Sequence, residues 1–134
     1  DQDVLHRRLL IFSPSQGLYV KDFLLSSSDY SAELCWNINS ALDGSRIIVP
    51  DGSSIDLKLD SSVENKNGES SYSVEDGWYS ACYGRKNAIK RLVSVVEGKE
   101  NSSFTSVFNL QGIEGDWYLE AEMRATKFIS QMVN

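Results

Sequence analysis

The sequence predicts a mainly β protein, a small antiparallel barrel or sandwich with one or two short helices, with an α+β fold as the alternative. Three observations lead to this class. Apolar and polar residues alternate in several segments, turn sequences such as Asp43-Gly44 separate these segments, and prolines occur only twice. The 134 residues contain no internal repeat and no Pro-rich or Gly-rich linker. We therefore expect a single globular domain spanning residues 1–134.

The first half of the chain predicts strands joined by tight turns. Val4–Phe12 fits either a strand or a short helix. Residues 30–60 predict three strands of an antiparallel meander: Tyr30–Ile38, Arg46–Val49 and Ser53–Asp60, the last two joined by a turn at Pro50-Asp51-Gly52. Alternation gives two of these strands an apolar face, formed by Tyr30, Ala32, Leu34, Trp36 and Ile38 in one and by Ile55, Leu57 and Leu59 in the other.

The middle of the chain is more polar. Residues 61–71 form a Ser-rich and Asn-rich tract in which Asn67-Gly68 is a turn signal, so we expect a loop or a hairpin tip. The two short runs that follow, Tyr72–Val74 and Trp78–Tyr83, predict a strand pair around a turn at Glu75-Asp76-Gly77.

Two later segments, residues 86–97 and 117–132, fit a strand and a helix almost equally well. The first has apolar residues at helical spacing but is rich in β-branched valine. In the second, large apolar residues alternate with charged ones from Trp117 to Thr126, although Trp117, Ala121, Ala125, Phe128 and Met132 also follow helical spacing. We favour a strand through Thr126, because such alternation rarely arises by chance.

The charge of the chain restricts its partners. Thirteen Lys and Arg residues against nineteen Asp and Glu residues give a net charge of −6, which argues against a nucleic-acid partner. Four cations lie close together at Arg85, Lys86, Lys90 and Arg91, and we interpret them as a solvated edge rather than a docking patch. No apolar run is long enough to span a membrane.

Two features predict a periplasmic or extracellular location. The chain opens at Asp1 without a leader pattern, which suggests that a leader or a membrane anchor has been removed. The chain also has two cysteines, Cys35 and Cys82, each beside aromatic residues in a strand-like run. We predict a disulfide between them, as is typical of an oxidising compartment.

The residues that usually carry catalysis are scarce. The single histidine, His6, lies beside two arginines near the N-terminus and is expected at the surface, and no Gly-x-Ser-x-Gly nucleophile motif occurs. The chain lacks the ligand spacing of a zinc or calcium site and a Gly-rich phosphate loop. On a strand, Glu120 and Glu122 would share a face as a glycosidase pair does, but a solvated face explains them better. We predict no catalytic residue, no metal and no cofactor.

Aromatic pairs supply the candidate binding residues. Adjacent strand residues point to opposite faces, so Trp78-Tyr79 and Trp117-Tyr118 would each send one ring away from the core. We expect Tyr79 and Tyr118 to be the outward members, because a hydroxyl tolerates water better than an indole does.

These observations favour a non-enzymatic extracytoplasmic binding domain. One form would be the periplasmic partner subunit of a membrane-anchored sensor or regulator, which binds a protein partner and, as a further option, a small apolar ligand. The first alternative is a secreted or periplasmic inhibitor or immunity protein whose acidic surface blocks a basic enzyme. A small hydrolase is the third hypothesis.

Overall fold

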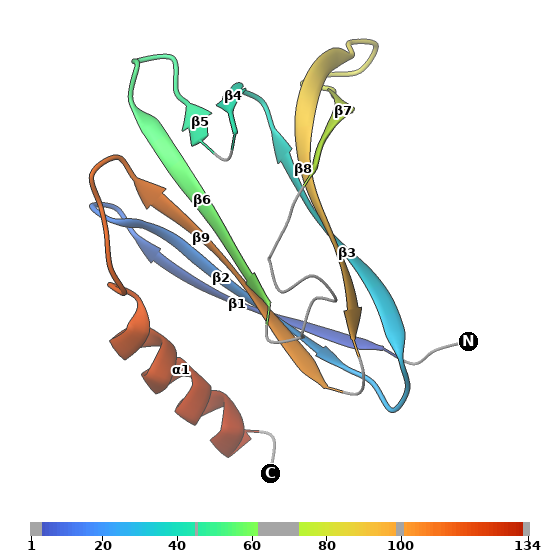
Figure 1. Ribbon diagram of the computed structural model, residues 1–134, viewed down its shortest axis with the longest axis vertical. Helices are drawn as coiled ribbons and strands as arrows, with labels where there is room; N and C mark the ends of the chain where they lie inside the picture. Colours follow the sequence, from blue (N-terminus) through green and yellow to red (C-terminus); the bar gives the residue numbers. More distant parts are fainter. Residues whose placement is uncertain (1–3, 45, 62–72, 99–100, 133–134) are drawn as a thin grey trace.

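The computed structural model describes residues 4–44, 46–61, 73–98 and 101–132 and contains two antiparallel sheets and one helix (Figure 1). The larger sheet has six strands, which are in spatial order β1 (Leu5–Ser13), β2 (Gly17–Leu25), β9 (Ser102–Leu110), β6 (Ser54–Ser61), β5 (Arg46–Ile48) and β4 (Ala41–Asp43). The smaller sheet has three strands, in the order β3 (Tyr30–Ile38), β8 (Asn87–Gly98) and β7 (Ser73–Tyr79). The helix α1 spans Leu119–Met132.

These elements form three layers. The smaller sheet lies over one face of the larger sheet, and α1 lies over the opposite face (Figure 1). The predicted mainly β class is confirmed, and in the described part of the chain the sheets pack as a sandwich without closing into a barrel. The predicted apolar face of Tyr30–Ile38 is the face turned toward the larger sheet, since Trp36 on that face contacts Phe108 of β9.

The apolar core lies between the two sheets. Its buried members come from four strands: Ile38 of β3, Ile47 of β5, Leu57 of β6 and Leu92 of β8. Half-buried apolar side chains pack around them, namely Trp36, Leu42, Ile55 and Phe108. Because strand side chains alternate, each of these strands contributes to this core with every second residue. On the opposite face of β8, Ile89 and Val93 are buried as well.

The predicted meander is correct in part. Strands β4, β5 and β6 are consecutive neighbours, and their turns lie at Asp43-Gly44 and Pro50-Asp51-Gly52 as expected. The first strand of the predicted meander, Tyr30–Ile38 (β3), belongs instead to the other sheet, where it pairs with β8 over nine residue positions. Local turn sequences determine which strands follow each other closely, but the sheet that β3 joins depends on a partner more than 50 positions away.

The predicted turn at Glu75-Asp76-Gly77 is wrong, because β7 runs through it without a break. Gly77 is a strand residue at the point where the Arg91 side chain of β8 crosses it, and a Cβ atom there would lie 2.5 Å from Cδ of Arg91. The glycine therefore serves close packing and not a reversal of the chain. Of the neighbouring segment 86–97, residues 87–97 lie in the strand β8. Of Val4–Phe12, residues 5–12 lie in the strand β1. The loop expected at residues 61–71 lies almost entirely outside the described residues.

The preferred strand from Trp117 through Thr126 is also wrong, because residues 117–118 form a turn and residues 119–126 belong to α1. Tyr118, Glu122 and Ala125 lie three and four residues apart and form the half-buried face that packs on the larger sheet. The Tyr118 ring stacks on Tyr19 of β2 with 4.3 Å between ring centroids. In the described part of the chain no helix is long and apolar enough to cross a membrane.

Candidate functional site

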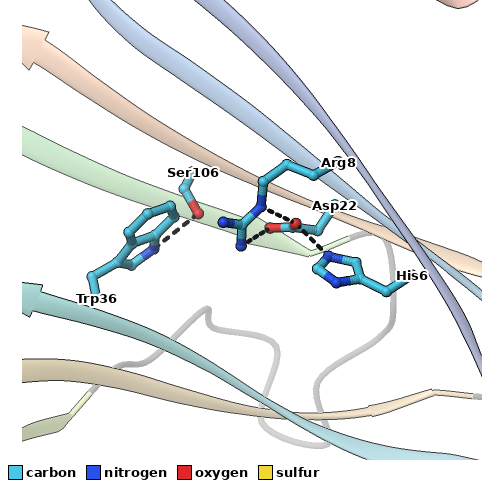
Figure 2. A network of polar contacts seen from close by, with 5 residues as sticks. All are labelled: His6, Arg8, Asp22, Trp36 and Ser106. Carbon is cyan, nitrogen blue, oxygen red and sulfur yellow. Dashed lines mark hydrogen bonds and ion pairs between the residues drawn. The ribbon is translucent and has the colours of Figure 1, made fainter.

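A buried carboxylate lies at the centre of a polar network between the sheets (Figure 2). Asp22 of β2 is only 3% exposed. Its Oδ1 accepts hydrogen bonds from Nε2 of His6 at 2.7 Å and from Nε of Arg8 at 2.6 Å, and its Oδ2 accepts a longer one from Nη2 of Arg8 at 3.3 Å. A buried carboxylate requires such partners, because desolvation otherwise disfavours its charged form.

The hairpin of β1 and β2 places these three residues together. Arg8 is the direct register partner of Asp22, and His6 lies two positions earlier on the same face of β1. All three side chains therefore point toward the smaller sheet, into the space between the layers (Figure 2).

The network also connects the two sheets. The guanidinium carbon of Arg8 lies 5.3 Å from the centroid of the Trp36 ring on β3, within the range of a cation–π contact. The indole Nε1 of Trp36 donates a hydrogen bond of 3.3 Å to Oγ of Ser106 on β9 (Figure 2). Beside the apolar core, the sandwich is thus joined by polar contacts that involve four strands.

The geometry of this network favours a structural role over catalysis. An aspartate bonded to a histidine resembles the orienting half of a nucleophile-activating triad. The hydroxyl in the network, however, belongs to Ser106, which is fully buried and already accepts the Trp36 hydrogen bond. A substrate could not reach this oxygen without opening the sandwich.

Sequence reasoning missed this network. His6 was expected to be a surface residue, and although its side chain is half exposed, its Nε2 is bonded to a buried group. The signal that could have found it is the spacing of His6 and Arg8 on one face of a strand, opposite an aspartate in the next strand of a hairpin. The closing turn at residues 14–16 sets that register.

The other notable surface is the aromatic and basic end of β7. Trp78 is 63% exposed, its neighbour Tyr79 is also exposed, and Tyr83 in the following turn projects fully into solvent. Nζ of Lys86 lies 4.4 Å from the centroid of the Trp78 ring. We call Trp78, Tyr79, Tyr83 and Lys86 the β7 aromatic surface.

An open depression adjoins the β7 aromatic surface. It has a volume of about 250 Å³ and lies between the ends of β3, β7 and β8. Ala88, the register partner of Trp78, forms part of its wall. Lys90 and Asp76 form an ion pair across two strands at its rim. This pair holds the pKa of Asp76 below its usual value, because the ammonium group donates a hydrogen bond to the carboxylate and attracts its charge.

The second predicted aromatic pair lies at a different place and is less accessible. Trp117 is half-buried and donates a hydrogen bond of 2.8 Å from its Nε1 to Oδ1 of the buried Asn109. Tyr118 is half-buried between Tyr19 and Trp117, and its hydroxyl donates to Asp116. The assumption that adjacent residues face opposite sides fails here because the chain is entering a helix. The structure therefore does not bring Trp117 and Tyr118 together with Trp78 and Tyr79.

The structure contradicts the predicted disulfide, because Cys35 and Cys82 are both free. Cys35 is in register with Val93 in the middle of β8, whereas Cys82 lies in the turn beyond the Tyr79–Asn87 pair at the start of β8. Six strand positions separate these levels, which corresponds to roughly 20 Å, and a disulfide requires Cα atoms within about 7 Å of each other.

Both cysteines have surroundings that the sequence did not indicate. Sγ of Cys35 accepts hydrogen bonds from Nε and Nη2 of Arg91 at 3.1 and 2.9 Å. The hydrogen bonds to Cys35, together with electrostatic attraction, raise the pKa of Arg91. Cys82 is exposed, and its carbonyl oxygen accepts a hydrogen bond from the Ser80 hydroxyl.

The predicted proximity of Glu120 and Glu122 is wrong, because residues two apart on a helix do not share a face. Glu120 pairs with Arg124 one turn later on the exposed side of α1. Glu122 points to the larger sheet, where Nζ of Lys21 lies 2.8 Å from its Oε1. Among the described residues, no three His, Cys, Asp or Glu side chains gather in a group that could hold a metal ion.

Comparison with known proteins identifies no relative. No protein-family model, no curated protein and no solved structure matches the chain.

Proposed function

We propose that this protein is a non-enzymatic binding domain that contacts a protein partner through the β7 aromatic surface. The observation that carries this proposal is the exposure of Trp78, 63% of which is accessible at the end of an edge strand. Tryptophan is among the residues most enriched at binding hot spots, where its burial contributes much of the affinity. Tyr79, Tyr83 and Lys86 surround it with rings and a cation.

The charges of this surface suggest the chemistry of the partner. The chain as a whole carries a net charge of −6, but Arg85, Lys86 and Lys90 lie within or next to the β7 aromatic surface, with Asp76 as the partner of Lys90. We infer that the partner presents acidic side chains around an apolar one, because local complementarity steers association and rejects wrong partners.

The proposed contact does not require an extracytoplasmic location. Two free cysteines remove the disulfide as an argument for an oxidising compartment. A cationic and aromatic surface can bind an acidic partner in any compartment, so the proposed contact does not depend on location.

The test is a comparison of exposed aromatic residues in different places. Phe128 on α1 is 62% exposed, which makes Phe128→Ala a matched control for Trp78→Ala. The wild-type protein and both variants are immobilised and exposed to a native extract, and a retained protein is then titrated by calorimetry. We expect Trp78→Ala to weaken binding about 30-fold, the effect of a hot spot worth about 2 kcal/mol, and Phe128→Ala to leave it unchanged.

A charge reversal tests the chemistry of the partner. Lys86→Glu should weaken binding further at low salt than at high salt, because ionic strength screens the interaction that it reverses. Circular dichroism confirms that each variant is folded. Equal affinity of the wild type and Trp78→Ala, with both folded, would contradict the proposed function.

A further inference from the structure

The second interaction surface is the free edge of the larger sheet. Strand β1 pairs with β2 at nine consecutive positions without a bulge, and its other side pairs with no described strand. No residue of β1 is buried. A long, regular edge strand presents a row of backbone donors and acceptors on which another strand can pair.

The side chains of β1 do little to block such pairing. The strand contains no proline and no acidic residue. The guanidinium of Arg8 is directed inward, where it pairs with Asp22. Arg7 is the other arginine of β1, and it does not bind this carboxylate. Leu10 and Phe12 are 60% and 71% exposed, on the face turned toward the smaller sheet. Natural edges are usually protected by charges or bulges, whereas the second half of this one is apolar.

We propose that two copies of this chain pair through β1 in an antiparallel ladder, with Leu9 facing Leu9 of the second copy on the two-fold axis. Directly opposite residues in such a ladder point to the same face, so opposite positions must have the same parity. A register centred on Leu9 is the one that satisfies this condition and pairs all nine residues of β1.

The charges of β1 favour this register over a parallel ladder and over an antiparallel ladder centred on Arg8. Its only charged or titratable side chains, His6, Arg7 and Arg8, lie in its first half. In the proposed register they face the apolar second half of the other strand, with Arg8 opposite Leu10 and His6 opposite Phe12. A parallel ladder would place each cation opposite its own copy, and an antiparallel ladder centred on Arg8 would place Arg8 opposite Arg8. Like charges directly opposite are destabilising, so both alternatives are disfavoured.

The pairing would cover the exposed apolar side chains of this edge. Phe12 would lie against His6 of the second copy, and Leu10 against the alkyl part of Arg8, whose guanidinium is held by Asp22. A two-fold contact of this kind closes at the dimer, because each chain uses the same strand once. This surface lies on a different sheet from the β7 aromatic surface, and either proposal can fail without the other.

Cross-linking tests the register in the full chain. In a Cys35→Ser, Cys82→Ser background, Leu9→Cys should form a disulfide-linked dimer on mild oxidation, because the two Cα atoms would lie about 4.5–5.5 Å apart. The matched variant Leu10→Cys should not, since its two copies would be two positions out of register and about 8 Å apart. Efficient linkage through position 10 and none through position 9 would overturn the register.

Sedimentation velocity tests the association itself. The wild type should show a concentration-dependent species of twice the 15.0 kDa chain mass, and Phe12→Lys should shift it to the monomer. Phe128→Lys changes a comparably exposed phenylalanine on α1 and should leave the dimer intact. A wild type that remains monomeric, or a dimer that dissociates with Phe128→Lys and persists with Phe12→Lys, would refute the proposal. A monomer that loses capture of another protein with Phe12→Lys would show that a foreign strand is the occupant, which also refutes it.

Discussion

Substitution of Asp22 is the sharpest test of how this sandwich is joined. Asp22→Asn preserves the size of the side chain but removes the negative charge that His6 and Arg8 share. Only one amide oxygen would remain as an acceptor, where the carboxylate now receives three hydrogen bonds. The substitution therefore isolates the contribution of a buried charge and its donors.

The expected magnitude follows from the burial of each partner. Hydrogen bonds to a charged group contribute about 1.5–3 kcal/mol each to stability. The His6 and Arg8 side chains are 51% and 40% exposed, so water replaces part of what they lose. We expect Asp22→Asn to lower the free energy of unfolding by about 2–3 kcal/mol, which corresponds to a decrease in Tm of roughly 6–12 °C for a domain of this size.

Urea denaturation followed by circular dichroism measures this loss, and an unchanged m-value would show that the two-state transition is preserved. Asp56→Asn is the matched control, because Asp56 pairs with Arg46 at 3.1 Å but both side chains are exposed. Exposed ion pairs contribute less than about 1 kcal/mol. If Asp22→Asn costs no more than Asp56→Asn, the network does not stabilise the fold as we describe.

Three further predictions concern single sites. Gly17→Ala should destabilise the protein by about 3 kcal/mol or more in urea denaturation, because φ is +146° and a Cβ atom would overlap the carbonyl oxygen of Phe108; a loss below about 1 kcal/mol would contradict this. Tyr30→Phe should stabilise the fold by about 1 kcal/mol, because its buried hydroxyl has no hydrogen-bond partner in the described structure. Burial raises the pKa of Tyr30, so wild-type stability should decrease as the pH rises above about 10, where the unfolded chain ionises first, and the variant should lose this part of the decrease. Alkylation of the denatured, unreduced protein should label both Cys35 and Cys82. If mass spectrometry finds neither thiol labelled, the two cysteines form the disulfide after all.

Local patterns in the sequence were sufficient to identify the buried face of a strand and the tight turn between two consecutive strands. The alternation in Tyr30–Ile38 identified the face turned to the core, and Pro50-Asp51-Gly52 identified the turn between β5 and β6. Alternation directly reports that one face of a strand is buried. For the pair Trp78-Tyr79 the same rule predicted an inward indole and an outward tyrosine, but both rings are exposed, Trp78 more than Tyr79.

The candidate site was only partly visible. The contact of Lys86 with Trp78 depends on how the turn after β7 folds back, and the sequence around it reads as a solvated cationic edge. The polar network was not foreseen, because Asp22 becomes buried only when the smaller sheet covers β2. The local sequence of a strand does not show whether a second sheet will cover one of its charged residues.

What the sequence by itself determined is the class of the fold: a mainly β domain whose strands alternate between apolar and polar faces. Tertiary structure decided between strand and helix where the local periodicity fits both. Residues 117–132 fit periods of 2 and 3.6 alike, and the helix prevails where Tyr118 stacks on Tyr19 and Glu122 meets Lys21. Partners about 100 positions away in the chain make these contacts, and such pairings leave no trace in a local pattern, because they exist only once the sheet has formed.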